Sequence, residues 1–325
     1  MYSLQNIEWK KSGKPEGTES LYYNGENIEV THNALILGKS GTLDFFTYSN
    51  IFNWKKWYKY TGLEDLTLRV TINGQFTVKI YSDDSLILNK NVSSSGGPVD
   101  ISVSGEYKNA IISFTLESEE GGSFLGGEWI SLMENKNYHP VKIALVMCTF
   151  NRDEYLYGNL KVLKGCLPEN YAVFIVDNGN RIEEESVTAM DPRFKLFHNN
   201  NTGGSGGFTR GLVEAIRDDE EWTHVHFMDD DVTIEPESLY RTVSFLSLLK
   251  EEYREAFLSG SMLRMDTPWI LHENTAEWTG VLIKSRNKGL DLRNRDNILN
   301  NESEYYSPVL LFTECYLVNL LQKIT

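Results

Sequence analysis

Two patterns of apolar residues divide the chain. In residues 1–138, short runs rich in β-branched and aromatic residues alternate with turn-forming residues, without a helical period. The runs that predict strands are residues 27–30, 34–37, 43–46, 66–72, 76–81, 86–91, 99–103 and 110–116. Many short, evenly spaced strands are typical of an antiparallel β-sandwich, here of the jelly-roll kind. Asn73-Gly74 predicts a type I′ hairpin between two runs, and residues 93–98 predict a loop.

The pattern changes near residue 139. A continuous apolar run at residues 141–147 is typical of a strand buried on both faces of a parallel sheet. Further predicted strands at residues 171–176, 193–198 and 224–228 alternate with helical periods at residues 152–166, 205–217 and 236–249. This alternation predicts a mostly parallel sheet flanked by helices. We therefore expect an all-β domain at residues 1–138 and an α/β domain at residues 139–325.

Each of the four strands predicted after residue 140 ends in a polar cluster. The clusters are Thr149 with Arg152, Asp177 with Asn178, a glycine-rich segment at residues 203–207, and the acidic run 229–231. A parallel sheet brings the carboxyl ends of its strands to one edge, where open α/β folds bind ligands. Most glycine-rich loops are only flexible, and this one lacks the Gly-Lys-Ser/Thr ending of a P-loop. Any one of these clusters alone is a weak signal. Together they favour a nucleotide site.

The acidic run follows an apolar strand directly. Adjacent carboxylates repel each other when they are partly desolvated. Asp229 and Asp231 alternate along the chain and supply the hard oxygen ligands that Mg²⁺ or Mn²⁺ prefers. A solvated acidic turn is the ordinary explanation of such a run, but its position at a strand end favours a metal site.

Composition narrows the choice of partners and compartment. The formal net charge of −15 over 325 residues argues against nucleic acid as the main partner. A phosphorylated ligand must then be held by a metal, backbone amides or single arginines. Three cysteines without metal-like spacing indicate a reducing compartment. We see no signal peptide and no apolar run of about 18 residues, so we expect a cytoplasmic protein.

The second half resembles the GT-A glycosyltransferases of the inverting family 2 type. Within that group it is similar to the bacterial galactofuranosyltransferases, which place a β-sandwich before a Rossmann-like GT-A domain. The resemblance rests on the segments CTFNR at 148–152, VDNG at 176–179, NTGGSGGFTRG at 201–211 and MDDD at 228–231. These motifs fall within residues 141–285, while the first domain matches only in kind and position.

The resemblance implies a metal-dependent, inverting transfer of galactofuranose from UDP-galactofuranose to a glycan or lipid-linked acceptor in cell-surface polysaccharide synthesis. It implies Mn²⁺ or Mg²⁺ at Asp229 and Asp231, and an acceptor side at His272, Glu273 and Trp278. It implies uracil recognition at Asp177. The donor-binding residues that it implies are Thr149, Arg152, Asp177, Asn178, Gly203, Gly204, Ser205, Gly206, Gly207 and Asp230.

An inverting transfer also needs a general base. The family supplies it from a Trp-Asp-Asp segment, with a metal-binding His further on, and neither occurs in these 325 residues. We therefore expect a C-terminally incomplete domain that binds UDP-sugar weakly and transfers poorly or not at all. Glu273 is the substitute catalytic candidate, although an acceptor-binding or capping carboxylate is the more ordinary role.

Other interpretations stay open. The donor is alternatively a nucleotide-rhamnose or another nucleotide-sugar, or the chain is a non-catalytic carbohydrate-binding protein. Aromatic residues at 54–60 suit either sugar binding or core packing, of which packing is favoured. The interpretation is compatible with peripheral association at the inner membrane face and with a homo-oligomer.

Overall fold

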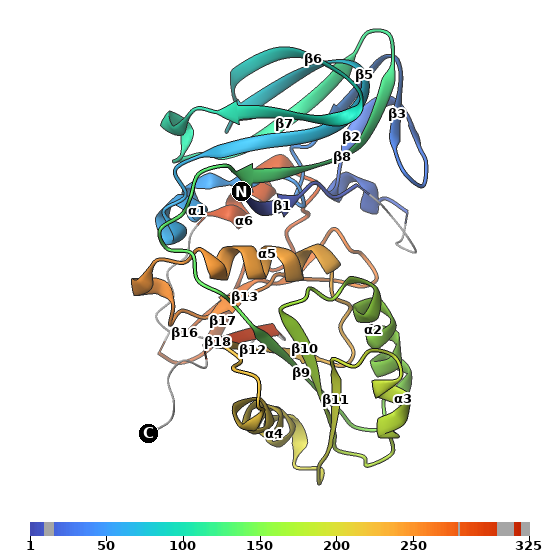
Figure 1. The fold of residues 1–325 in the computed structure, drawn as a ribbon, viewed down its shortest axis with the longest axis vertical. Coiled ribbons are helices and arrows are strands. Elements are labelled where there is room, and N and C mark those ends of the chain that lie inside the picture. The colour runs from blue at the N-terminus through green and yellow to red at the C-terminus, as the bar shows by residue number, and fades with distance from the viewer. Residues whose placement is uncertain (10–15, 279, 304–314, 320–325) are drawn as a thin grey trace.

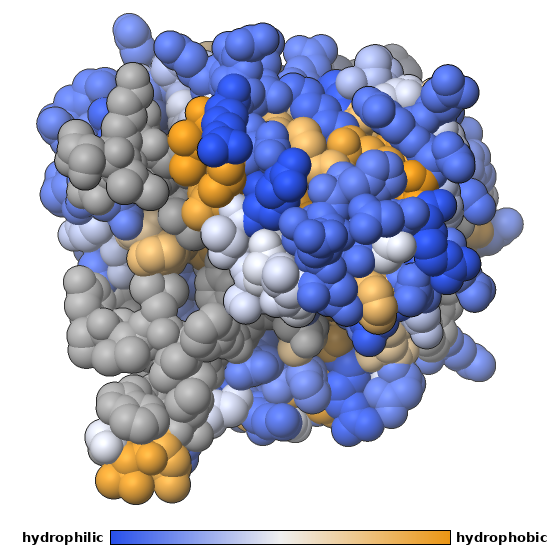
Figure 2. Space-filling model, turned by 90° about the horizontal axis from the view of Figure 1, so that it is seen from below, coloured by the Kyte–Doolittle hydropathy of each residue, from blue (hydrophilic) through white to orange (hydrophobic). Residues whose placement is uncertain are grey.

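The computed structural model describes residues 1–9, 16–278, 280–303 and 315–319 (Figure 1). The N-terminal strands form the upper part of the molecule and the α/β layer forms the lower part, with helix α5 between them. Seen from below, the surface is mostly hydrophilic with separate apolar patches, in keeping with the acidic composition (Figure 2). Among the described residues, no helix is long and apolar enough to cross a bilayer.

The N-terminal domain is antiparallel throughout its described pairings. Its strands are β1 (Tyr2–Asn6), β2 (Asn24–Val30), β3 (Leu35–Asp44), β4 (Phe52–Asn53), β5 (Leu66–Ser82), β6 (Ser85–Val103), β7 (Ile111–Ser118) and β8 (Gly122–Ser131). Short helices η1 (Thr18–Leu21), α1 (Trp54–Thr61) and η2 (Gly105–Tyr107) connect them. The expected antiparallel pairing of the first half is confirmed, and the domain boundary near residue 138 stays a prediction.

The strands belong to one hydrogen-bonded sheet that folds over on itself. Residues 67–74 of β5 pair with β8, whereas residues 77–82 of the same strand pair with β7. Strand β3 likewise pairs with β8 at residues 35–37 and with β7 at residues 41–44. Strands β3 and β5 therefore each pair with both β7 and β8. The β-sandwich and its jelly-roll topology stay predictions.

The predicted hairpin at Asn73-Gly74 is wrong. Strand β5 continues through both residues, and Gly74 takes a φ of 121° beside a register shift at Thr71 and Asn73. The chain reverses instead at Asp83, between β5 and β6. Strand β6 likewise continues through the expected loop at residues 93–98. Because β5 and β6 pair along most of their length, tertiary pairing overrides the local turn signal and the glycine serves a bulge.

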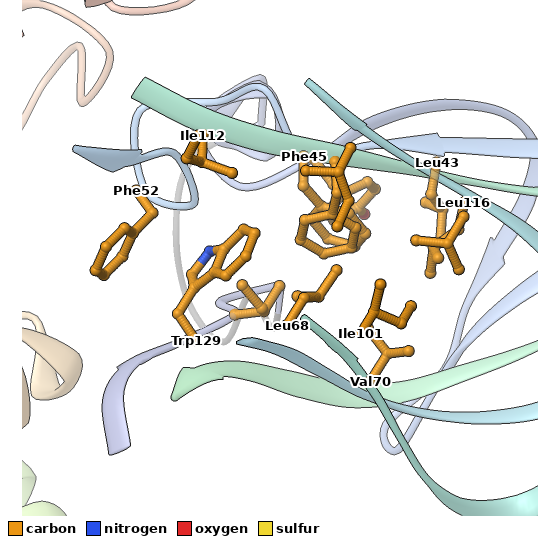
Figure 3. Close-up of a cluster of buried hydrophobic side chains, with 14 of the residues drawn as sticks. Leu43, Phe45, Phe52, Leu68, Val70, Ile101, Ile112, Leu116 and Trp129 are labelled. Atoms are coloured by element: carbon orange, nitrogen blue, oxygen red, sulfur yellow. The ribbon is translucent and has the colours of Figure 1, made fainter. Parts of the chain in front are cut away.

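Helix α1 was not predicted from the sequence. The Asn53 side chain accepts a hydrogen bond from the Lys56 backbone N–H, and Gly62 ends the helix with a φ of 69°. Trp54 and Trp57 are buried, so core packing explains these two aromatic residues. Their neighbours in the core, among them Phe45, Phe52 and Trp129, point inward (Figure 3).

The second domain contains a six-stranded sheet in the order β11-β10-β9-β12-β18-β13. Its strands and helices are β9 (Ile143–Thr149), α2 (Asp153–Cys166), β10 (Tyr171–Asp177), α3 (Glu184–Thr188), β11 (Phe194–His198), α4 (Gly203–Arg217), β12 (His224–Asp229), α5 (Pro236–Ser247), β13 (Leu258–Ser259) and β18 (Cys315–Asn319). Strands β9 to β12 are parallel, and β18 is antiparallel to both neighbours. The predicted mostly parallel sheet is confirmed. Helix α4 covers one face, while α2, α3 and α5 cover the other.

The remaining elements are η3 (Glu251–Tyr253), β14 (Met262–Leu263), β15 (Leu271–Glu273), β16 (Thr275–Trp278), β17 (Ile283–Arg286) and α6 (Arg295–Glu302). Of these, β15 and α6 pack back onto the N-terminal domain, through Leu271 and Ile298. Leu271 and Leu292 are fully buried in the N-terminal core, as is Leu248 just after α5. Trp57 and Phe245 meet edge to face at 5.0 Å across the same boundary. Buried residues of the second half therefore complete the N-terminal core, while the six-stranded sheet has separate apolar clusters on its two faces.

Candidate functional site

The carboxyl ends of four strands meet at one edge of the parallel sheet. In the register of β9, β10 and β12, Thr149 lies opposite Asp177, and Asp229 lies opposite Cys148. Strand β11 ends alongside them, with His198 opposite Asp177. The expected convergence of the polar clusters is confirmed.

Asp177 holds the turn that follows β10. Its carboxylate is 1% exposed and accepts hydrogen bonds from the backbone N–H groups of Gly179 (2.7 Å), Arg181 (2.7 Å) and Ile182 (2.9 Å). These amides satisfy a buried carboxylate that would otherwise carry a large desolvation cost. Its role in uracil recognition stays a prediction, and its role in shaping the turn is observed.

Asn178 links three segments at the sheet edge. Its Nδ2 donates to Cys148 Sγ and to the carbonyl oxygen of Gly203, both at 3.3 Å. Its Oδ1 accepts from Asn199 Nδ2 at 2.8 Å. The side chain is almost fully buried, so it fixes the start of α4 relative to β9 and β11.

The glycine-rich segment is the start of a helix rather than the expected loop. Helix α4 begins at Gly203, whose φ is 73°. A Cβ on Gly207 would lie 2.0 Å from Cys148 Sγ, and one on Gly211 would lie 2.2 Å from Val146 Cγ1. These two glycines let α4 lie directly against β9. Because the segment is helical, its first backbone N–H groups point out of the helix start and favour a negatively charged ligand.

The other residues of this segment face solvent. Gly204 and Ser205 are exposed, and a Cβ on Gly204 would meet nothing within 4 Å. Gly206 lies over Thr202, because its Cβ would come 1.8 Å from Thr202 Oγ1. The exposed start of α4 therefore leaves room for a ligand beside the strand ends.

The acidic run carries a basic partner from the loop after β9. Arg152 Nη1 donates to Asp231 Oδ2 and lies 3.4 Å from Asp230 Oδ1. These two carboxylates raise the pKa of Arg152 above its ordinary value. Asp230 is 4% exposed and its Oδ2 has no hydrogen-bond partner, whereas Asp231 is exposed. Asn159 Nδ2 donates to the Asp230 carbonyl at 2.8 Å and holds the backbone of the run.

Two residues at the end of β9 lie beneath these acids. Burial, and then the charges of Asp230, Asp229 and Asp177, raise the pKa of the Cys148 thiol to about 11. A neutral, half-buried thiol is a packing group and not a nucleophile. Thr149 is 2% exposed, and its Oγ1 has no partner. A buried hydroxyl without a partner is costly, which makes Thr149 a candidate ligand contact.

The donor set fits a hard divalent cation held by few protein ligands. Among the described residues, no group of three or more His, Cys, Asp or Glu side chains is arranged to hold a metal. Mg²⁺ is commonly held by one or two carboxylates together with water and substrate phosphates. Asp229 and Asp231 match that smaller requirement, and the unpaired Oδ2 of Asp230 lies between them in sequence. The assignment of these two residues as metal ligands stays a prediction.

The comparison with known families decides the class of this domain. Residues 144–252 match the family model described as glycosyl transferase family 2, and this range contains all four strand ends. The chain carries a glycosyltransferase family 2 domain.

Sequence similarity to curated proteins extends beyond this family 2 domain into the rest of the chain. The chain is 26% identical over 302 residues to the galactofuranosyltransferase GlfT2 of Mycolicibacterium smegmatis, covering 83% of this chain and 45% of that protein. It is 23% identical over 294 residues to GlfT2 of Mycobacterium tuberculosis, with the same coverage. The chain thus spans about half the length of the curated relatives that it matches.

Solved structures give weaker matches. The mannosyltransferase PcManGT from Pyrobaculum calidifontis, solved with GDP-Man and Mn²⁺, is 13% identical and covers 56% of this chain and 46% of its own, with a TM-score of 0.33. TarS of S. aureus is 20% identical and covers 45% of this chain and 26% of its own, with a TM-score of 0.31.

The expected acceptor residues lie outside the six-stranded sheet of the family 2 domain. His272 and Glu273 are half-buried on β15, which pairs with β14 so that Glu273 is opposite Met262. The backbone of Trp278 ends β16, opposite Ile283 of β17. The acceptor and base assignments for these residues stay predictions.

Asn159 and Asn199 support the site, through Asp230 and Asn178, but were not among the site residues predicted from the sequence. Asn159 occupies a buried position of α2, between Leu156 and Leu163 on the apolar face. A polar residue at a core position of an amphipathic helix normally has a specific partner, so this signal was present in the sequence. Asn199 belongs to a run of three asparagines and gives no such signal.

Proposed function

We propose that this chain transfers a galactofuranosyl residue from UDP-galactofuranose to a glycan or lipid-linked saccharide, with inversion and with Mn²⁺ or Mg²⁺. The observation that supports it best is the similarity to two curated galactofuranosyltransferases over 83% of the chain, which takes in both domains. The four strand ends supply a site of the right kind for a nucleotide-sugar.

The chemistry of the leaving group explains the composition of the site. UDP departs with developing negative charge, and a divalent cation held by Asp229 and Asp231 would neutralise it as a Lewis acid. Arg152 and the exposed start of α4 add positive potential at the same edge. Thr149 offers a buried hydroxyl to the nucleotide. This chain needs such local devices because its net charge is −15.

An inverting transfer removes one proton from the acceptor hydroxyl. Glu273 is our candidate for this base, and His272 and Trp278 are our candidates for the acceptor side. In β15 the Glu273 carboxylate is half-buried, beside the segment that follows β13 at the edge of the sheet. Glu273→Gln keeps the size of the side chain and removes its basicity, so it should abolish transfer while leaving UDP binding intact.

Calorimetry of the full chain with UDP, with and without Mn²⁺, tests the donor site. We expect binding that requires the cation and is lost in Asp231→Asn. Asp153→Asn is the matched control, because Asp153 is equally exposed on the same edge but pairs with Arg181. Affinity for glycans without any cation-dependent UDP binding would contradict the proposal and favour a carbohydrate-binding protein.

Donor choice is tested separately by mass spectrometry of the products. The full chain is incubated with a saccharide acceptor, Mn²⁺ and either UDP-galactofuranose or dTDP-rhamnose. We expect a product heavier by one hexose with the first donor only. Transfer of rhamnose alone would retain the enzyme class and replace the donor.

A further inference from the structure

The acidic run is already ion-paired with a cationic side chain, that of Arg152. The guanidinium of Arg152 contacts Asp231 and lies 3.4 Å from Asp230. The proposed function places a divalent cation on Asp229 and Asp231, so the two cations share Asp231 and both lie beside Asp230. They compete for this acidic run, because each raises the electrostatic cost of bringing in the other.

Asp230 is held in place by its surroundings, whereas the Arg152 side chain is exposed to solvent. Asp230 is almost fully buried and its carbonyl is fixed by Asn159. Arg152 precedes α2, and its side chain is 52% exposed. An exposed arginine changes rotamer at little cost, and its planar guanidinium suits phosphate as well as carboxylate. The side chain that moves is therefore Arg152.

We propose that Arg152 is the resident counter-ion of Asp230 and Asp231, and that it moves to the diphosphate of the donor when a divalent cation takes its place. This inference rests on the proposed function. The exchange keeps the charge of the buried Asp230 compensated in both states.

The exchange makes cation binding and nucleotide binding mutually dependent. Without nucleotide, a cation must displace Arg152 and binds weakly. The diphosphate offers Arg152 a second partner, so it raises the affinity for the cation, and by linkage the cation raises the affinity for the diphosphate equally. Arg152 is thus a positioning residue that prevents the site from filling with free cation.

The test measures Mn²⁺ affinity from the paramagnetic resonance signal of free Mn²⁺, using the full chain with and without UDP. For Arg152→Gln without UDP, we expect Mn²⁺ affinity about tenfold above that of the wild type, since one competing charge is removed. With UDP, we expect the enhancement of Mn²⁺ affinity to shrink by about the same factor. Arg152→Lys keeps the charge and should stay near the wild type.

Arg181→Gln is the matched control. Arg181 is similarly exposed but pairs with Asp153 at 3.6 Å, so its removal should leave Mn²⁺ affinity unchanged. An equal rise in this variant would overturn the inference, because a general charge effect would then explain the result. Thermal melts of each variant confirm that the exposed substitutions leave the fold intact.

Two further outcomes separate the inference from the proposed function. If Arg152→Gln weakens UDP binding but leaves Mn²⁺ affinity unchanged, Arg152 is a phosphate contact only; the exchange is then wrong and the proposed function stands. If neither the wild type nor any variant binds Mn²⁺ or UDP, the proposed function fails and the inference fails with it.

Discussion

Asn6 and Glu237 lie 231 positions apart and join the two domains through a pair of short hydrogen bonds. The Glu237 carboxylate accepts from the Asn6 backbone N–H at 2.7 Å and from Asn6 Nδ2 at 2.6 Å. Arg241 Nε donates to the same carboxylate at 3.0 Å, and Glu237 is only 5% exposed. The first strand of the chain is thereby fixed to α5, one of the helices that cover the six-stranded sheet of the second domain.

Glu237→Ala should destabilise the whole chain. It removes the buried acceptor of the Asn6 amide groups and of Arg241 Nε, while Arg241 Nη2 keeps its bonds to the carbonyls of Asn6 and Ser49. We expect a loss of about 3 kcal/mol in the free energy of unfolding. Denaturant unfolding followed by tryptophan fluorescence measures it, and we expect a single transition because Leu248, Leu271 and Leu292 of the second domain complete the core of the first.

The control for this prediction is Glu220→Ala. Glu220 also forms an ion pair, with Lys142, but both side chains are about half exposed. Exposed pairs contribute little, so the change should stay below about 0.5 kcal/mol. Equal losses in the two variants would show that the Asn6–Glu237 contact has no special role at the boundary.

Gly211→Ala should separate α4 from the sheet. The new methyl group would lie 2.2 Å from Val146 Cγ1 on β9, so the helix must shift at a cost of about 1–3 kcal/mol. Gly158→Ala in α2 meets nothing within 4 Å and should stabilise by about 0.5–1 kcal/mol. Thermal melting of both variants checks the opposite signs. A Gly211→Ala chain as stable as the wild type would contradict the close packing of α4.

Two buried histidines on β12 should make the fold sensitive to acid. Burial lowers the pKa of His226 to about 4, and burial followed by the charge of His139 lowers that of His224 to about 4. The unfolded chain binds protons near pH 6.5, so stability is full above that pH and declines as the pH falls toward 4. Between pH 7.5 and 5 we expect each histidine to account for a loss of about 2 kcal/mol.

Unfolding measured at both pH values in His226→Leu checks this. His226 faces the ring of Tyr171 at 6.4 Å, and its Nδ1 has no partner, so an apolar replacement suits the site. We expect this variant to lose less stability at pH 5 than the wild type does. His32→Leu alters an exposed histidine and should retain the wild-type pH response. A wild-type chain equally stable at both pH values would refute the assignment.

The second domain was predictable from the sequence because its signals are local and repeated. Strands β9 and β10 are continuous apolar runs, and helical periods follow β9, β11 and β12, so the topology and the shared edge follow from general rules. The short helix α3 after β10 was not predicted. The polar clusters were found for the same reason. Contacts formed between distant side chains, such as Arg152 with Asp231, are not encoded in any spacing.

The first domain was less predictable. Asn73-Gly74 has the composition of a turn, yet it lies within β5 because pairing with β6 and β8 overrides the local preference. Helix α1 was hidden by its aromatic residues, which have low helix propensity and are typical of strands. In both places tertiary packing decides between two conformations that the local sequence permits.

Thr149→Val should move stability and nucleotide affinity in opposite directions. Thr149 Oγ1 is buried without a partner, and valine has nearly the same shape, so losing the hydroxyl should stabilise the free chain by about 1 kcal/mol. If the hydroxyl binds the nucleotide, UDP affinity should fall about tenfold, as for one lost hydrogen bond. Thr115→Val is the matched control, because Thr115 Oγ1 on β7 is also buried and unpaired but belongs to the N-terminal domain. It should raise the melting temperature in the same way and leave UDP affinity unchanged, so a loss of affinity confined to Thr149→Val would identify the end of β9 as part of the nucleotide site.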